Sequence, residues 1–209
     1  MSDVILFGPP QSSYVRTARM TCVEKGITHD LQPVDAGSAS HERLHPWCRV
    51  PAMRRGTFEL YETSAISRYI NETFDGPELL PRTADARAVM EQWVSAINCY
   101  IYDSTVRNYA LKYIVPAFRG EQPDRAAIEA GLPNMQRDVA RLDSAYAKST
   151  WMAGESLSLG DLFVAPIAFT VAMFPEGREA LGKARNLSRA FEALSQRDSF
   201  HKAHDGVFG

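Results

Sequence analysis

VILFGPPQSSYVRTAR, residues 4–19, is the stretch that decides the predicted fold. The apolar run Val4–Phe7 is short and stops at Gly8, Pro9 and Pro10, which is typical of a buried strand followed by a turn. Ser12 or Ser13 then stands where a helix N-cap is expected, and apolar residues follow at helical spacing. A hydroxyl therefore lies at the carboxyl end of a strand and at the positive end of a helix. Ligands of α/β sheets bind there, and the free backbone N–H groups favour an anion.

Composition and charge restrict the class of protein. The 209 residues are 45% hydrophobic and 23% charged, as in ordinary globular proteins of one large or two small domains. A net charge of −2 without basic clusters predicts no binding to nucleic acid or to an anionic membrane.

We see no signal peptide and no bilayer-spanning apolar run, and we therefore expect a cytoplasmic protein. Cys22, Cys48 and Cys99 form no CxxC pair, which predicts reduced and mostly buried thiols.

The first third of the chain alternates strands and helices. After the first helix, residues 27–33 can form a second, parallel strand, which completes a βαβ unit. Residues 36–46 are polar and irregular, with room for one helical turn. Residues 50–53 and 58–61 read as a hairpin, and a helix with an apolar stripe runs from about residue 63 to 74. The predicted order is βαβ, connector, ββα.

Beyond residue 76 the pattern changes to helices only. Residues 75–82 hold two prolines and a glycine, which is typical of a linker. Long amphipathic helices are predicted near residues 89–101, with a kink before Pro116, and near 128–146, with a bend or split at Gly131 and Pro133. The capping box 158–161 starts a helix that is apolar nearly all round, so a central buried helix is expected. Shorter helices are predicted at 178–185 and 187–196, before a polar tail.

Ser12 does not fit the pattern of a nucleophilic serine, because no GxSxG elbow surrounds it and no histidine lies close by in sequence. Its hydroxyl at a helix N-terminus can instead donate a hydrogen bond to an anion carried by a ligand. If that anion is a thiolate, the hydrogen bond and the helix dipole both lower the pKa of the thiol. The plain alternative is a stabilising N-cap.

Two further stretches suggest contacts to a peptide-like ligand. Arg49-Val50-Pro51 precedes a strand, and a cis Val50-Pro51 bond would leave the Val50 backbone free to pair with an extended peptide. An ordinary trans proline is the alternative. Glu62-Thr63 starts a helix, where Thr63 and the first N–H groups suit a carboxylate and Glu62 suits an ammonium group. A simple helix cap is again the alternative.

Taken together and in this order, three stretches resemble the N-terminal half of the cytosolic glutathione transferases. They are Ser12-Ser13-Tyr14-Val15-Arg16, Arg49-Val50-Pro51-Ala52 and Glu62-Thr63-Ser64-Ala65-Ile66. The capping box Ser158 to Asp161 resembles the signature of that family's C-terminal domain. The resemblance implies a thioredoxin-like α/β domain with a cis-proline at residues 1–76, a linker at 77–83, and an all-α domain at 84–209 that forms a hydrophobic substrate pocket. It also implies a homodimer.

The resemblance implies a serine-type enzyme, similar to the phi, theta and zeta classes. Its co-substrate would be glutathione, with no metal, and its partner a small electrophile or hydroperoxide, as in detoxification. Ser12 is the implied catalytic residue that holds the glutathione thiolate. The implied glutathione contacts are Ser12, Ser13, Arg49, Val50, Pro51, Glu62 and Thr63.

Aromatic residues suggest where the second substrate and a partner subunit bind. Tyr102, Tyr109 and Tyr113 are spaced as one face of a regular helix and are candidates for the pocket wall, as are Tyr14 and Phe118. Packing in the core is an equal interpretation for each of them. Trp47 lies where several classes of the family place an aromatic dimer contact, and packing within its own chain is the alternative.

Other functions compete with this interpretation. His41-Glu42-Arg43-Leu44-His45 matches the HExxH zinc motif, but Pro46 disfavours helical geometry at His45, so the match is interpreted as accidental. A glutathione-dependent isomerase of the maleylacetoacetate type is similar at the paired serines but carries cysteine where this chain has Tyr14. A protein that binds glutathione or a hydrophobic ligand without catalysis is the remaining alternative.

Overall fold

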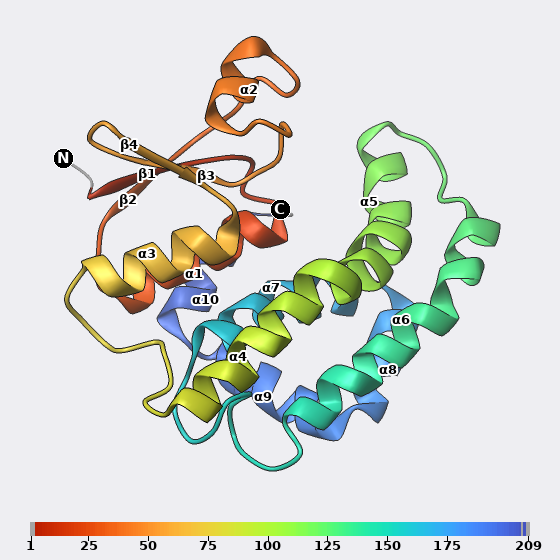
Figure 1. The fold of residues 1–209 in the computed structure, drawn as a ribbon. Helices are drawn as coiled ribbons and strands as arrows, with labels where there is room; N and C mark the ends of the chain where they lie inside the picture. Colours follow the sequence, from red (N-terminus) through yellow and green to blue (C-terminus); the bar gives the residue numbers. More distant parts are fainter. Residues whose placement is uncertain (1–2, 206, 208–209) are drawn as a thin grey trace. The chain divides into compact units, whose positions relative to one another are not determined.

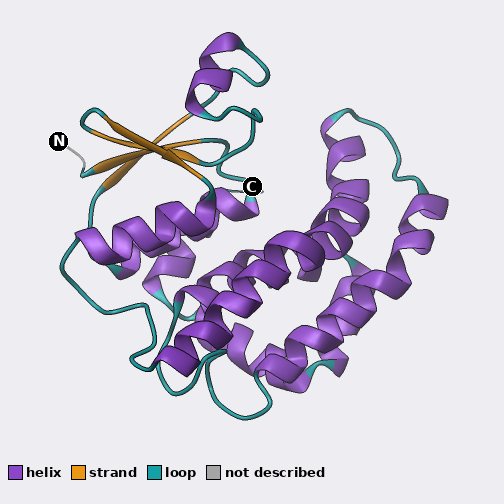
Figure 2. Ribbon diagram, viewed as in Figure 1, coloured by secondary structure: helices purple, strands orange, loops and turns teal. Residues whose placement is uncertain are grey.

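The computed structural model describes residues 3–205 and 207 and divides the chain into two compact units (Figure 1). One unit contains the chain up to Leu80 together with the segment from Ser195 onward, and the other spans Pro81–Leu194. Within the described residues, the strands all belong to the first unit, and helices make up the second (Figure 2).

The first unit is built on a mixed four-stranded sheet in the order β2-β1-β3-β4. β1 and β2 run parallel, whereas β3 is antiparallel to both β1 and β4. The predicted order of strands and helices is confirmed, and the arrangement is thioredoxin-like. The elements of this unit are β1 (Val4–Phe7), α1 (Ser13–Glu24), β2 (His29–Gln32), α2 (Ala39–Leu44), β3 (Ala52–Arg55), β4 (Phe58–Tyr61), α3 (Thr63–Thr73) and α10 (Asp198–His204).

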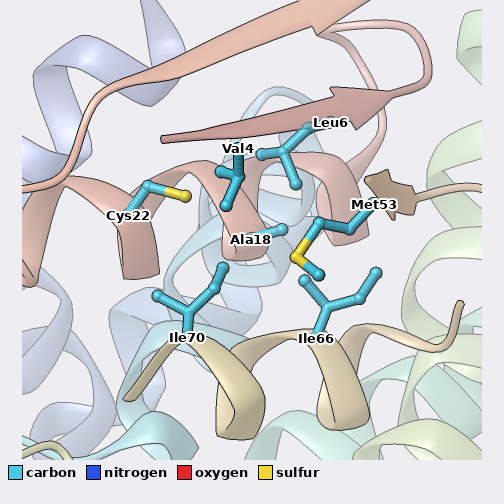
Figure 3. Close-up of a cluster of buried hydrophobic side chains, with 7 residues drawn as sticks. All are labelled: Val4, Leu6, Ala18, Cys22, Met53, Ile66 and Ile70. Atoms are coloured by element: carbon cyan, nitrogen blue, oxygen red, sulfur yellow. The ribbon is translucent and has the colours of Figure 1, made fainter. Parts of the chain in front are cut away.

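Apolar side chains from the sheet and from two helices form the core of this unit. α1 and α3 cover one face of the sheet (Figure 1). Because the sheet and both helices share one buried cluster, the ends of the strands and the starts of the helices are held in fixed places. The cluster consists of Val4 and Leu6 from β1, Ala18 and Cys22 from α1, Met53 from β3, and Ile66 and Ile70 from α3 (Figure 3).

The C-terminal segment is a helix, where the sequence predicted a polar, solvated tail. α10 packs on α1, and its residues Phe200 and Ala203 are buried. Arg197, just before α10, donates two hydrogen bonds of 2.6 and 2.7 Å to the Glu24 carboxylate. The prediction of a polar tail is wrong. The helix is too short to show a clear pattern, and the residues that it packs against lie at the other end of the chain. The sequence-based boundary assigned these residues to the helical domain, whereas here they belong to the first unit.

The second unit begins with a long helical stretch that changes its geometry twice. The sequence pattern predicted one α-helix with a kink before Pro116. The structure has helix through Pro116, as part of α5, and differs from the prediction in its two π-helical segments. A pattern based on 3.6 residues per turn does not reveal such segments. The elements of this unit are α4 (Ala84–Ala96), η1 (Ile97–Ile101), η2 (Asp103–Ala110), α5 (Leu111–Phe118), α6 (Arg125–Ala145), α7 (Leu159–Ala172), α8 (Pro175–Lys183) and α9 (Arg185–Ser195).

α6 is one continuous helix in spite of Gly131 and Pro133. Gly131 lies so close to η2 that a Cβ atom there would be 2.5 Å from the carbonyl oxygen of Asn108. Glycine is therefore required at this position for close packing of α6 on η2, and it does not mark the end of a helix.

α7 is the buried helix that the sequence predicts. Its capping box is present, and the Asp161 carboxylate accepts a hydrogen bond of 2.8 Å from the backbone N–H of Ser158. Burial raises the pKa of Asp161, against the hydrogen bonds that favour its charged form. Within the described residues, no helix, α7 included, is both long and apolar enough to span a membrane.

The three cysteines are free thiols with different exposures. Cys22 lies in the core, where burial raises the pKa of its thiol to about 12. Cys48 is half-buried and Cys99 is exposed on η1. The expectation of mostly buried thiols is therefore wrong for Cys99.

The docking of α10 predicts a pH-dependent stability. The His204 ring stacks on Phe200, with 3.9 Å between ring centroids, and burial, followed by the charge of Arg16, lowers its pKa to about 3. The unfolded chain takes up a proton at this histidine below about pH 6.5 while the folded chain does not, so acid favours unfolding. Through this histidine, the free energy of unfolding of the wild-type protein should fall by about 2 kcal/mol between pH 7 and pH 5. We expect His204→Phe to lack this part of the pH dependence.

Urea unfolding at several pH values measures this effect. His201→Gln, a change at an exposed position of the same helix, is the matched control. Equal pH dependence in the wild-type protein and in His204→Phe would contradict the prediction.

Candidate functional site

Three neighbouring strands bring distant parts of the sequence to one edge of the sheet. Phe7 pairs with Ala52, and Ala52 pairs with Tyr61. Gly8, Pro51 and Glu62 directly follow or precede these paired residues and must therefore lie at the same edge. Adjacent strands are about 4.8 Å apart, so the three residues fall within about two strand spacings.

Ser12 presents its hydroxyl at the start of α1. Its backbone is extended, and its Oγ accepts a hydrogen bond from the Val15 N–H at 3.4 Å. A hydroxyl that accepts in this way keeps its own proton for donation, and Ser12 is only half-buried. Ser13, by contrast, is buried, and its Oγ accepts a hydrogen bond from the Arg16 guanidinium at 3.3 Å. The geometry favours Ser12 over Ser13 for contact with a ligand.

Gly8 allows the start of α1 and the Val50 segment to approach each other. A Cβ atom at Gly8 would lie 2.7 Å from Cγ2 of Val15 and 3.0 Å from Cβ of Val50. Its φ of +144° is also one that side-chain-bearing residues rarely adopt. The absence of a side chain at Gly8 is thus what permits Ser12 and Val50 to lie on either side of one strand end.

The Val50-Pro51 peptide bond is cis. Pro51 is buried directly before β3, while Val50 is half-buried and Arg49 is exposed. The Arg49 carbonyl oxygen lies 3.0 Å from Nε2 of His41. Among the described residues, none makes a hydrogen bond to the Val50 N–H.

Glu62 and Thr63 stand at the start of α3, as predicted. Thr63 is buried and opens the helix, and the Glu62 carbonyl oxygen accepts the first helical hydrogen bond, from Ile66. Glu62 has φ +72°, a strained conformation for a residue that is not glycine, and its side chain is 62% exposed. The Glu62 carboxylate is therefore accessible at the sheet edge, directly before the first residue of α3.

His41 and His45, the two histidines of the HExxH match, lie against different parts of this edge. α2 ends at Leu44, and His45 is extended (φ −147°, ψ 108°), as Pro46 led us to expect. His41 contacts Arg49, whereas Nε2 of His45 lies 3.7 Å from the Glu62 carboxylate. Burial lowers the pKa of His45, and Glu62 opposes this effect. Within residues 3–205 and 207, no three side chains of the metal-ligating types are grouped to hold an ion.

Sequence reasoning missed the role of these two histidines because it considered them only as metal ligands. Both are almost fully buried, and each directs a ring nitrogen toward a residue of the predicted site. The pattern of histidines flanking a short helix gave no signal for this arrangement.

Two of the predicted pocket residues, Tyr109 and Tyr113, share a hydrogen-bond partner, Glu176. Tyr109 is completely buried, and its hydroxyl accepts a hydrogen bond from the Gly177 N–H at 2.7 Å and donates to Glu176 at 3.2 Å. Tyr113 also donates to Glu176, at 2.7 Å. Tyr109 and Tyr113 therefore lie on the same side of this helical stretch, with 5.9 Å between their ring centroids.

The other aromatic candidates differ in exposure. Tyr14 on α1 and Tyr102 are half-buried, and Phe118, at the end of α5, is exposed. The Arg107 guanidinium lies 5.8 Å from the centre of the Tyr102 ring. Tyr102, Tyr113 and Phe118 thus retain accessible surface in the helical unit, and Tyr109 does not.

Trp47 lies just before the Val50 segment and is 67% exposed. Its ring makes edge contacts with His45 and with Tyr61, at 6.2 and 6.0 Å between centroids. Packing within its own chain therefore covers only part of this side chain.

The fold is that of a class of proteins that join a thioredoxin-like domain to an all-helical domain. In the thioredoxin-like domain, a helix N-terminus and an X-Pro turn meet at one edge of the sheet. Residues 11–73 match the family model of the glutathione S-transferase N-terminal domain, and residues 106–198 match that of the C-terminal domain. Together the two matches cover most of the chain, which belongs to the glutathione S-transferase family.

Individual relatives agree with this assignment. The chain is 25% identical to glutathione S-transferase 3 of Zea mays over 97% of this chain and 93% of the relative. It is 28% identical to glutathione S-transferase F9 of Arabidopsis thaliana over 93% of each. The solved structure of glutathione S-transferase III in apo form superposes with a TM-score of 0.88, over 100% of this chain and 98% of that chain at 24% identity, and shares the fold.

The close approach at Gly8 predicts that a methyl group is not tolerated there. We expect Gly8→Ala to lower the free energy of unfolding by about 2–4 kcal/mol, because the new Cβ clashes with Val15 and Val50 in addition to the strained φ. Gly56→Ala is the matched control, since Gly56 has φ +59° but no atom within 4 Å of a Cβ. Chemical denaturation compares the two variants, and an equal loss in both would contradict the clash.

Proposed function

We propose that the protein is a glutathione transferase of the serine type. In the proposed reaction the glutathione thiolate attacks an electrophilic carbon, a C–S bond forms, and the leaving group departs with its electron pair. The thiol proton passes to solvent. With a hydroperoxide as substrate, two glutathione molecules supply the two electrons, and the products are glutathione disulfide, an alcohol and water. The curated relatives named above, which are glutathione S-transferases, support this proposal.

The observation that carries the proposal is the accessible hydroxyl of Ser12 at the N-terminus of α1. A thiol with a pKa near 8.5 is mostly protonated at pH 7, and lowering that pKa by two units requires about 2.7 kcal/mol. A hydrogen bond to a charged group contributes about 1.5–3 kcal/mol, and a helix terminus adds about 0.5 kcal/mol. The Ser12 hydroxyl and the helix together are therefore sufficient to hold a thiolate.

The other groups at the sheet edge suit the rest of the tripeptide. The free Val50 N–H, next to Pro51, can pair with the backbone of an extended ligand. The α3 N-terminus at Thr63 suits the α-carboxylate of the γ-glutamyl group, and the exposed Glu62 carboxylate suits its ammonium group. Arg49 is exposed and offers a positive charge to a carboxylate, and Ser13 supports the start of α1.

The helical unit is proposed to supply apolar surface for the electrophile. Tyr102, Tyr113 and Phe118 retain exposed ring surface there and are the candidates. Tyr14, two residues after Ser12, remains a candidate on the first unit. Tyr109 is not included, because its ring lies in the interior.

We also propose that the enzyme is a cytoplasmic homodimer that acts in detoxification without a metal. Trp47 supports the dimer, since a tryptophan that is 67% exposed is a typical anchor of protein interfaces.

Removal of the Ser12 hydroxyl tests the catalytic role. We expect Ser12→Ala to lower kcat/KM about 10–100-fold at pH 7 and to raise the apparent pKa of the pH–rate profile by about 1–2 units, because the thiolate loses its donor. KM for glutathione should change less than about threefold, since the hydrogen bond matters chiefly to the anion. Initial rates with a nitro-activated aryl chloride measure all three quantities.

Ser12→Thr is the matched control, because it keeps the hydroxyl and should retain most of the activity. Ser13→Ala distinguishes the two serines. Full activity in Ser12→Ala would show that the assignment is wrong, and glutathione binding without turnover in the wild-type protein would favour a binding protein.

The proposed dimer is tested at Trp47. We expect Trp47→Ala to raise the dimer dissociation constant at least about tenfold, since truncation of a buried interface tryptophan costs about 2 kcal/mol or more. Sedimentation velocity over a range of concentrations gives this constant. Tyr100→Ala, which removes a side chain of similar exposure from the helical unit, is the control. A monomeric wild-type protein would contradict the proposal.

A further inference from the structure

His41 is a buried histidine with both ring nitrogens in hydrogen bonds. Its side chain lies on α2 and is 3% exposed. Nδ1 accepts a hydrogen bond from the Gly37 N–H at 3.3 Å, and Nε2 lies 3.0 Å from the Arg49 carbonyl oxygen. A backbone N–H can only donate and a carbonyl oxygen can only accept. The two contacts together therefore require the neutral ring with its proton on Nε2.

The Arg49 carbonyl belongs to the same peptide unit as the Val50 N–H. That unit is planar, and the one cis bond among the described residues is the next one, between Val50 and Pro51. In a trans peptide the C=O and the N–H point in opposite directions. When His41 holds the Arg49 carbonyl, it thereby directs the Val50 N–H away from α2.

Apart from His41, no described residue makes a hydrogen bond to the peptide unit between Arg49 and Val50. The Val50 N–H donates no hydrogen bond to a described residue, and Arg49 itself is exposed. Cys48, the residue before Arg49, has a strained φ of +47°, so the segment does not take this path by preference. The hydrogen bond from His41 to the Arg49 carbonyl fixes the peptide plane.

We propose that His41 is a positioning residue that orients the Arg49–Val50 peptide for the backbone of glutathione. This inference rests on the proposed function and assigns His41 no contact with the ligand. His41 acts through one peptide plane, so its loss weakens the binding of glutathione and leaves the thiolate at Ser12 in place.

Two variants separate the hydrogen bond from the volume of the ring. His41→Phe keeps a ring of similar size but loses both hydrogen bonds, and we expect it to raise KM for glutathione about tenfold. We expect kcat at saturating glutathione and KM for the electrophile to change less than about threefold. His41→Gln retains an N–H donor and should recover most of the affinity for glutathione. Arg43→Gln, at an exposed position of the same helix, is the matched control.

The proton position on His41 can be measured in the wild-type protein, so this test does not depend on whether a variant folds. The ¹⁵N chemical shifts of the His41 ring should show the proton on Nε2, and a proton on Nδ1 would overturn the inference. If the wild-type enzyme turns over glutathione but a folded His41→Phe variant keeps its KM, the inference alone is wrong. If the wild-type protein neither binds nor turns over glutathione, the proposed function fails, and this inference fails with it.

Discussion

The pairing of Leu6 with Met53 is the constraint on which the site depends. Both side chains are completely buried in the core of the first unit. A slip of one residue between β1 and β3 would turn the side chains of the shifted strand to the other face of the sheet and take either Leu6 or Met53 out of the apolar cluster. The core therefore fixes the register, and the register in turn places Gly8 beside Pro51, and Pro51 beside Glu62 at the end of β4. The positions of the groups proposed to bind glutathione follow from a hydrophobic interaction that contains none of them.

The same helix provides two very different environments for sulfur. Cys22, near the C-terminal end of α1, lies in the core, where burial raises the pKa of its thiol. A ligand thiol at the N-terminal end would meet the Ser12 hydroxyl and the positive end of the helix, which both lower a thiol pKa. The buried Cys22 thiol and the proposed thiolate site thus lie toward opposite ends of α1. This arrangement keeps the proposed chemistry on the ligand's sulfur.

Local signals in the sequence were sufficient to predict the strand and the two helix starts that position the candidate site. The run Val4–Phe7, the N-cap at Ser12 and the start of α3 each depend on residues close in sequence, and the structure has them where the pattern placed them. Features that depend on distant partners were not predictable. α10 packs on α1, at the other end of the chain, and the buried Tyr109 bonds Glu176 and Gly177, which are also distant in sequence.

Strained backbone and buried polar side chains occur together around the Val50-Pro51 turn. Among the described residues other than glycine, only Cys48 and Glu62 have positive φ, and they flank the Val50-Pro51 turn. Each such residue costs about 1–3 kcal/mol, and it persists only where the surroundings hold it in place. Here the surroundings are the buried imidazoles of His41 and His45, one against the Arg49 carbonyl and the other near the Glu62 carboxylate. His41 on α2 and His45 just after it therefore offer polar ring atoms to this segment, which an apolar helix could not, since an apolar side chain makes no hydrogen bond to a carbonyl oxygen.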